Sequence, residues 1–529
     1  MLLTMLRHSP TLWISPSWQA EHPRATPNPR LWVALASVVL ASASPCEALA
    51  VFQAPTCPPP HALPQWEDAP HEHHFSSPRG GEKAERDAFG AFPGQFASEN
   101  FIIKWGDQLA LDPVDASVVA AALEVSWVEF IDVLGFPAPQ GSEDWLFNVY
   151  IGNSGGNAPP IGDFAGYFTT DPSGVGMIVL APDAAVDVDI RSQVAAHEFF
   201  HAVQYETGAY LAAPLAASWY REATADWAAL EAFPDDRIVP RHLVGYAYTP
   251  HLGIDYLAPE DDETILRYRH YGAFILPLFV SEHIADPSLV AQSFLGAGPS
   301  DSPLEVLDAL LREADSDLAS AFGAFAAHNA TWDYELGRDF EDAIEEYGAL
   351  VPGADQRFAV QMEGTGTDGW VDPPVSLRPW PNGYNVIRLR RPAQGLLHVG
   401  FEALQEDGVQ WWATLVRDYL DHAEYVPITQ GTGGSPAEIS LMVAEESAFY
   451  LAISATSQVQ APDLGLPYRF RLEVATDPEP DPLSCGCTAS LTRSSTGKDQ
   501  HRVEHNSRTA IAALVVVLIG ALRRRSYPR

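Results

Sequence analysis

The feature that most constrains the fold is a predicted helix at residues 190–205 that is apolar on most of its sides. Its central part, residues 194–204, reads VAAHEFFHAVQ. A helix that is apolar nearly all round has no face suited to water and is buried. Gly208 follows as a natural stop for the helix. The sequence therefore predicts a fold in which this helix lies in the interior.

Two histidines of this helix are spaced to share a metal ion. His197 and His201 are four residues apart, so their imidazoles project from one face about one turn apart. Ring nitrogens at that separation suit a tetrahedral zinc ion with metal–nitrogen distances of about 2.0–2.1 Å. Glu198 lies beside them, where a carboxylate can take a proton from zinc-bound water and pass it to the leaving amine.

A second helical segment offers a third ligand. Residues 218–228 read SWYREATADWA, and Glu222 in this segment lies 21 residues after His201. Its carboxylate would complete a set of two histidines and one glutamate, which leaves a fourth position for water. Asp226, one turn further on, is placed to accept the free ring N–H of His197 or His201. The alternative is a buried helix whose histidines are satisfied without a metal.

These residues resemble the gluzincins, the thermolysin-like clan of zinc peptidases. In that clan the H-E-x-x-H helix is followed by a glutamate and, one turn later, commonly by an aspartate. His197, Glu198, His201, Glu222 and Asp226 hold these positions here. The resemblance implies a bound zinc ion, cleavage of peptide bonds, and an edge strand above the helix that aligns the substrate.

The resemblance also implies a tyrosine or histidine that stabilises the oxyanion of the transition state. The segment RYRHYGAF offers Tyr268, His270 and Tyr271, and His242 is a further candidate. Among these we favour Tyr271 and His270 as catalytic residues. Residues 175–180, which read VGMIVL, are the candidate for the edge strand.

The charge balance excludes one class of partner. The chain has 31 basic and 69 acidic residues and a formal net charge of −38. Such a field repels phosphate backbones, so we expect no nucleic-acid partner. The four cysteines lie at positions 46, 57, 485 and 487, so no disulfide framework is expected in the middle of the chain.

The N-terminal end is typical of an exported protein. Residues 31–43 read LWVALASVVLASA; basic residues precede them, and Ala48 and Ala50 follow at a plausible cleavage site. This order predicts a secretory signal peptide at residues 1–50. Residues 51–97 are rich in proline, histidine and charge without periodicity, which predicts a disordered leader or propeptide.

The C-terminal end combines a cysteine motif, an apolar run and a basic cluster. The predicted linker, residues 477–508, contains Cys485-Gly486-Cys487, and residues 509–529 hold TAIAALVVVLIGAL followed by three arginines. The arginines predict a cytoplasmic end. Together these parts resemble the MYXO-CTERM sorting tail of myxobacterial surface proteins. The resemblance implies a membrane-held apolar helix, a sorting protease that acts on the tail, and a secreted or cell-surface location.

Between the two ends, the periodicity predicts an α+β protein of two domains. Strand-like and helical segments, followed by mostly helical ones, form the expected zincin-like catalytic domain at residues 98–352, with an N-terminal mixed α/β part and a helical part. Short strands separated by turns predict a β-sandwich accessory domain at residues 355–476. The six predicted strands are 384–390, 396–401, 411–416, 439–444, 449–454 and 468–474.

The sequence as a whole therefore predicts a secreted zinc endopeptidase that hydrolyses peptide bonds in extracellular proteins or peptides. Zinc would activate water and polarise the scissile carbonyl, with Glu198 as general base. Two alternatives stay open. One is a zinc-binding surface protein without proteolytic activity, in which the β-sandwich carries recognition. The other is an aminopeptidase, or a hydrolase of a non-peptide bond.

Overall fold

The computed structural model describes most of the chain between residues 83 and 475. All of this belongs to one compact unit, Met1–Thr476. The predicted signal peptide, linker and sorting tail lie outside the described residues. The described ranges are 83–86, 89–109, 113–188, 190–212, 214–236, 238–258, 265–348, 369–389, 395–404, 408–419, 421–431, 436–443, 448–457 and 465–475.

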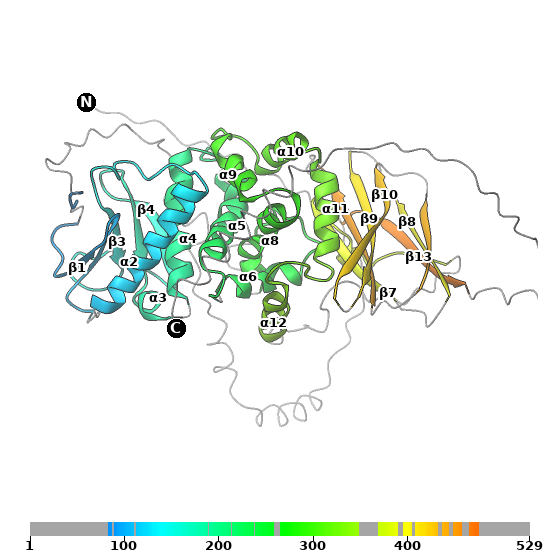
Figure 1. Cartoon of the computed structure of the whole chain (residues 1–529), viewed down its shortest axis with the longest axis horizontal. Coiled ribbons are helices and arrows are strands. Elements are labelled where there is room, and N and C mark those ends of the chain that lie inside the picture. The colour runs from blue at the N-terminus through cyan, green and yellow to red at the C-terminus, as the bar shows by residue number, and fades with distance from the viewer. Residues whose placement is uncertain are drawn as a thin grey trace, which may run out of the picture. The chain divides into compact units, whose positions relative to one another are not determined.

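The first part of the fold is a mixed five-stranded sheet (Figure 1). In spatial order its strands are β1 (Gly94–Ala97), β2 (Phe101–Trp105), β3 (Phe147–Ile151), β5 (Gly176–Leu180) and β4 (Gly166–Thr170). Strands β2, β3 and β5 are parallel, and both edge strands are antiparallel to their neighbours. The prediction that residues 175–180 form the edge strand is therefore wrong, because β5 is an interior strand and β4 is the edge.

Both faces of this sheet are buried, as its apolar strands require. Alternate residues point to opposite faces. In β3, Phe147 lies on the face covered by helices α2 (Pro113–Trp127) and α4 (Arg191–Thr207), where its ring is 5.7 Å from that of Phe199. Tyr150 lies on the other face, with Phe89 at 5.2 Å between ring centroids.

The folded part begins earlier than the sequence predicted. Residues 51–97 were expected to form a disordered leader, yet β1 pairs with β2. The fully buried Lys104 also donates a hydrogen bond from Nζ to the carbonyl of Arg86 at 2.7 Å. Arg86 in turn forms a 2.6 Å ion pair with Asp171. The end of the predicted leader is therefore part of this layer.

Helices make up the middle of the chain. Helix α4 ends at Gly208, whose φ of 70° is left-handed and suits glycine, and it packs along α5. Residues 128–133 and 280–284 form single π-helical turns, η1 (Val128–Val133) and η3 (Val280–Ile284). The other helices are α3 (Pro182–Val186), α5 (Pro214–Ala232), α6 (Ile238–Ala247), η2 (Ile265–Tyr268), α7 (Arg269–Gly272), α8 (Ile275–Phe279), α9 (Pro287–Leu295), α10 (Pro303–Glu313), α11 (Leu318–His328) and α12 (Gly337–Gly348).

Two antiparallel four-stranded sheets follow. Their orders are β10-β9-β12-β7 and β11-β8-β13-β6, and they share an apolar core that includes Phe401, Trp411 and Phe470. The six predicted strands correspond to β7 (Gly383–Leu389), β8 (Leu396–Ala403), β9 (Gln410–Asp418), β11 (Ala437–Met442), β12 (Ala448–Thr456) and β13 (Tyr468–Ala475). The described residues add β6 (Trp370–Val371), β10 (Ala423–Gly431) and the short turn η5 (Val375–Leu377). Helices and several sheets together confirm the predicted α+β class.

The sheet β10-β9-β12-β7 packs against the helical part. Helix α11 contacts β9 and β12, and the Nδ2 atom of Asn329 donates to the hydroxyl of Tyr384 at 2.9 Å. The loop at residues 250–254 is joined to residues 380–384 by backbone hydrogen bonds of 2.7–2.8 Å. The face of this sheet that points away from the sandwich core is therefore covered by the helical part of the fold, which carries the predicted site residues.

Within the described ranges, no helix is both long and apolar enough to cross a membrane. The apolar run at residues 509–522 falls outside those ranges.

Candidate metal centre

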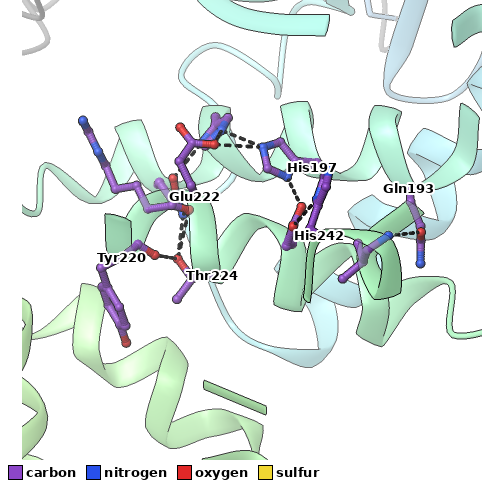
Figure 2. Close-up of polar contacts among 11 residues, drawn as sticks. Gln193, His197, Tyr220, Glu222, Thr224 and His242 are labelled. Carbon is purple, nitrogen blue, oxygen red and sulfur yellow. Dashed lines mark hydrogen bonds and ion pairs between the residues drawn. The ribbon is translucent and has the colours of Figure 1, made fainter. Parts of the chain in front are cut away.

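Two neighbouring helices bring the predicted ligands together (Figure 2). His197 and His201 lie one turn apart on α4, and Glu222 lies on α5. All three side chains are buried. They form the one group of metal-ligand residues whose donor atoms converge within 4.8 Å among the described residues.

The donor atoms form a nearly equilateral triangle. The Nε2 atoms of His197 and His201 are 3.0 Å apart. The Oε2 atom of Glu222 is 3.2 Å from Nε2 of His197 and 3.4 Å from Nε2 of His201. Ligands of a tetrahedral zinc ion at about 2.0–2.1 Å lie about 3.3 Å from one another. The triangle therefore has the size that zinc needs.

The partners of the histidines determine which ring nitrogens face this triangle. Nδ1 of His197 is 2.8 Å from Oδ1 of Asp226, and Nδ1 of His201 is 2.9 Å from Oε1 of Gln204. Both partner oxygens accept hydrogen bonds, so each neutral ring carries its proton on Nδ1. Both Nε2 atoms are then left as acceptors. Two nitrogen lone pairs and a carboxylate oxygen thus face one another, an arrangement that a cation stabilises.

The acidic groups of the site are held in their charged form. Burial alone would raise the pKa of Glu222, but His201 and His197 in their protonated form outweigh burial and lower this pKa. Asp226 behaves in the same way: burial opposes ionisation, and His242 and His197 lower the pKa. Its second carboxylate oxygen, Oδ2, accepts a 2.7 Å hydrogen bond from Nδ1 of His242.

Glu198, the predicted general base, is fully buried on α4. The edge strand β4 passes directly over its side chain. A Cβ atom added at Gly166 would lie 2.8 Å from Cγ and 3.0 Å from Oε1 of Glu198. The space that the carboxylate occupies therefore depends on the absence of a side chain at position 166.

The four candidate oxyanion donors lie together on α6, η2 and α7. The ring of Tyr271 is 6.1 Å from that of His197 and 4.9 Å from that of His242, between centroids. The ring of His270 is tilted by 39° relative to that of Tyr271, with 4.2 Å between the ring centroids. The hydroxyl of Tyr268 is already bonded, since Arg267 donates to it at 2.6 Å.

Two of these candidates have ring nitrogens available for a further hydrogen bond. Both nitrogens of His270, and Nε2 of His242, are buried and find no hydrogen-bond partner in the described part of the chain. Burial lowers the pKa of His270 to about 4, although nearby Glu222 opposes this shift. The ring of His270 is therefore neutral at pH 7 and carries one N–H donor.

Sequence reasoning missed three contributors to the site. Gln204 is the partner of His201; its position one turn after this histidine was the available signal. Gly166 and the bond between His242 and Asp226 carried no sequence signal, because both depend on contacts between segments far apart in the chain. The expectation that Asp226 would bind one of the two ligand histidines matches a contact to His197.

Comparison with solved structures adds no functional argument. Twelve chains match. One is a family GH115 4-O-methyl-alpha-glucuronidase with specificity for decorated arabinogalactans, at 11% sequence identity and a TM-score of 0.15. The match covers 64% of this chain and 53% of the glucuronidase, so the chain spans about half of that protein's length. A TM-score this low supports neither a shared fold nor a shared activity. A search of the curated proteins found no match.

Comparison with protein families corrects the functional prediction. The family model that matches covers residues 72–462, and its description is a family of unknown function. The family therefore gives the chain no peptidase activity, and the prediction that it hydrolyses peptide bonds, as an endopeptidase or an aminopeptidase, is wrong. Since the match spans well over half of the sequence, the chain belongs to the family of unknown function DUF6055.

Proposed function

We propose that this chain is a zinc-dependent hydrolase with a zincin-like centre. His197, His201 and Glu222 would hold the metal, and Glu198 would handle the proton of an attacking water. The observation that carries the proposal is the convergence of three acceptor atoms at 3.0–3.4 Å. Three buried acceptors that close repel one another unless a cation lies between them.

The surrounding residues suit this chemistry. A zinc ion would supply an acidified water and a Lewis acid for the electrophile. Asp226 fixes the His197 ring through its 2.8 Å contact with Nδ1. Glu198 follows His197 directly on α4 and is fully buried, which strengthens its interaction with a proton in transit. The proposal specifies the type of reaction, attack by water, and does not specify the bond that is cleaved.

His270 is the donor that we infer for the developing oxyanion, and Nε2 of His242 would add a second donor when this ring is in its imidazolium form. Both ring nitrogens of His270, and Nε2 of His242, are buried and lack hydrogen-bond partners among the described residues. Such groups become satisfied when a substrate oxygen binds them. Asp226 also accepts the Nδ1 proton of His242, so it orients this ring as well as that of His197. Tyr271 packs between these rings and remains a candidate catalytic residue.

The location proposed for this enzyme follows from the two ends of the sequence. We infer export by the apolar segment at residues 31–43, with the tail at residues 509–529 as a membrane-held signal for a sorting protease. The acidic net charge of −38 suits a protein that acts away from nucleic acid.

The test combines metal analysis with a panel of chromogenic substrates that covers esters and phosphodiesters. Wild-type protein should hold one zinc ion per chain and hydrolyse at least one substrate. Glu198→Gln should keep the zinc and lose about 10²–10⁴-fold in rate. Absence of zinc from the wild type would refute the proposal. Bound zinc with a rate that Glu198→Gln leaves unchanged would refute the role of Glu198.

A further inference from the structure

Gln204 lies at the meeting point of the two ligand-bearing helices. It is buried on α4, one turn after His201, and its Oε1 atom is 2.9 Å from Nδ1 of this histidine. Its amide nitrogen donates to the carbonyl of Arg221 and to the hydroxyl of Thr224, both at 2.9 Å. The side chain thus connects His201 with the segment of α5 that carries Glu222.

The orientation of this amide is fixed by its partners. The hydroxyl of Thr224 donates to the carbonyl of Tyr220 at 2.6 Å, so it receives the Gln204 bond as an acceptor. The Arg221 carbonyl can only accept. The nitrogen of the amide must therefore face α5, and its oxygen must face His201. Nδ1 of the neutral His201 ring is then the donor, and Nε2 is the ligand atom.

We propose that Gln204 is a positioning residue for the metal centre that acts on two of the three ligands. It holds the His201 ring in the tautomer that presents Nε2, and it holds the α5 backbone at Arg221, the residue before Glu222. This inference rests on the proposed zinc site. It differs from the role of Asp226, because Gln204 binds its histidine through a neutral amide and Asp226 through a carboxylate.

The experiment measures the zinc affinity of the full chain by competition with a chelator. Gln204→Leu should lower the affinity by about 10–100-fold, the usual effect of losing a partner of a metal-bound histidine. Its cobalt-substituted form should also show shifted d–d absorption bands. Gln193→Leu is the matched control, since Gln193 is also a buried glutamine of α4. Gln193 bonds instead to the backbone of Phe233, Asp236 and Val239, and in Figure 2 it lies on the opposite side of His197 from Glu222.

A second variant covers the case in which Gln204→Leu does not fold. Thr224→Val keeps the side-chain shape and removes one of the two acceptors that orient the amide, so the zinc affinity should fall several-fold. Wild-type affinity and an unchanged cobalt spectrum in either variant would overturn the inference, as would an equal loss of affinity in Gln193→Leu. A wild-type chain that binds no zinc would instead refute the proposed function.

Discussion

At the residue scale, the position of the proposed general base depends on a neighbouring glycine. Gly166 begins the edge strand β4, and its backbone lies against Glu198. Any larger residue would place its Cβ 2.8–3.1 Å from Cγ, Oε1 and Cδ of that glutamate. Contacts below 3.0 Å are too close for carbon atoms, so either the strand or the carboxylate would have to move.

Gly166→Ala should therefore reduce the rate of hydrolysis while the zinc content stays at the wild-type level. A displaced catalytic group costs on the order of 100-fold in rate, and the three atoms nearest to a Cβ at position 166 belong to Glu198 and not to a ligand. Steady-state rates and metal analysis of the same samples provide the measurement. Gly162→Ala is the control, because a Cβ there would meet Phe164 at an ordinary 3.4 Å. Equal losses in both variants would contradict the role given to Gly166.

The residues of the site differ in how far the sequence could predict them. His197, His201, Glu222 and Asp226 are recognisable because helical spacing alone places each pair on one face. The choice of His197 as the partner of Asp226 depends on how α4 and α5 pack, which spacing does not determine. His242 reaches the same carboxylate from a third helix, so no local pattern predicts it.

At the element scale, two short helices are held unusually close by glycines. A Cβ at Gly272 of α7 would lie 2.5 Å from the carbonyl oxygen of His242 on α6, and one at Gly245 would lie 2.7 Å from the backbone of Tyr268. This close approach brings the His242 ring next to Tyr271, with 4.9 Å between ring centroids. The positions of the proposed oxyanion donors thus depend on how closely α6 and α7 pack.

Gly272→Ala should push α6 away from α7 and weaken the contact between His242 and Asp226. We expect a loss of about 1–3 kcal/mol in the free energy of unfolding, as for other overpacked positions, and a reduced rate with zinc still bound. Chemical denaturation and the hydrolysis assay measure the two effects. Gly298→Ala, after the end of α9, is the control, because a Cβ there would meet the Asp301 side chain at an ordinary 3.4 Å. If Gly272→Ala is as stable as the wild type, the close packing of α6 and α7 does not require glycine at position 272.

Strands were predictable where their pattern is regular. Six of the strands after residue 355 follow alternating or apolar runs. Strand β10 contains Pro427, and its pairing with β9 shifts register between Pro427 and Thr429. Proline removes a ladder hydrogen bond and is confined to edges and bulges, so the sequence argues against a strand where the structure has an edge strand. The strand order of the first sheet could not be predicted from the sequence either. In this sheet β5 lies between β3 and β4, and the residues of the two strands do not show which one lies at the edge.

At the scale of the whole molecule, the metal would link the mixed sheet layer to the helical layer. Helix α4 packs on the first sheet, while α5 belongs to the helical part, and each contributes ligands. Ligand binding to the folded state raises stability with the logarithm of ligand concentration over Kd. The proposed zinc ion should therefore stabilise the fold as well as take part in the reaction.

Removal of zinc should lower the thermal midpoint of the described unit. A metal present at about 1,000 times its Kd contributes about 4 kcal/mol, which for a unit of this size corresponds to a shift on the order of 5–10 °C. Differential scanning calorimetry with 1,10-phenanthroline measures the shift, and the non-chelating 1,7-isomer is the control. Restoration of the midpoint by added zinc completes the test. Identical midpoints with both isomers would contradict a stabilising metal.

The contact between α11 and the sheet β10-β9-β12-β7 restricts how parts of different family members can be combined in one chain. A Cβ at Gly323 would lie 2.2 Å from the Trp412 ring, so helix and sheet fit as a matched pair. The family match, at residues 72–462, spans both sides of this contact. A chimera that joins the helices of one family member to the sheets of another would have to exchange positions 323 and 412 together, because a side chain on one side fills the space that the other leaves.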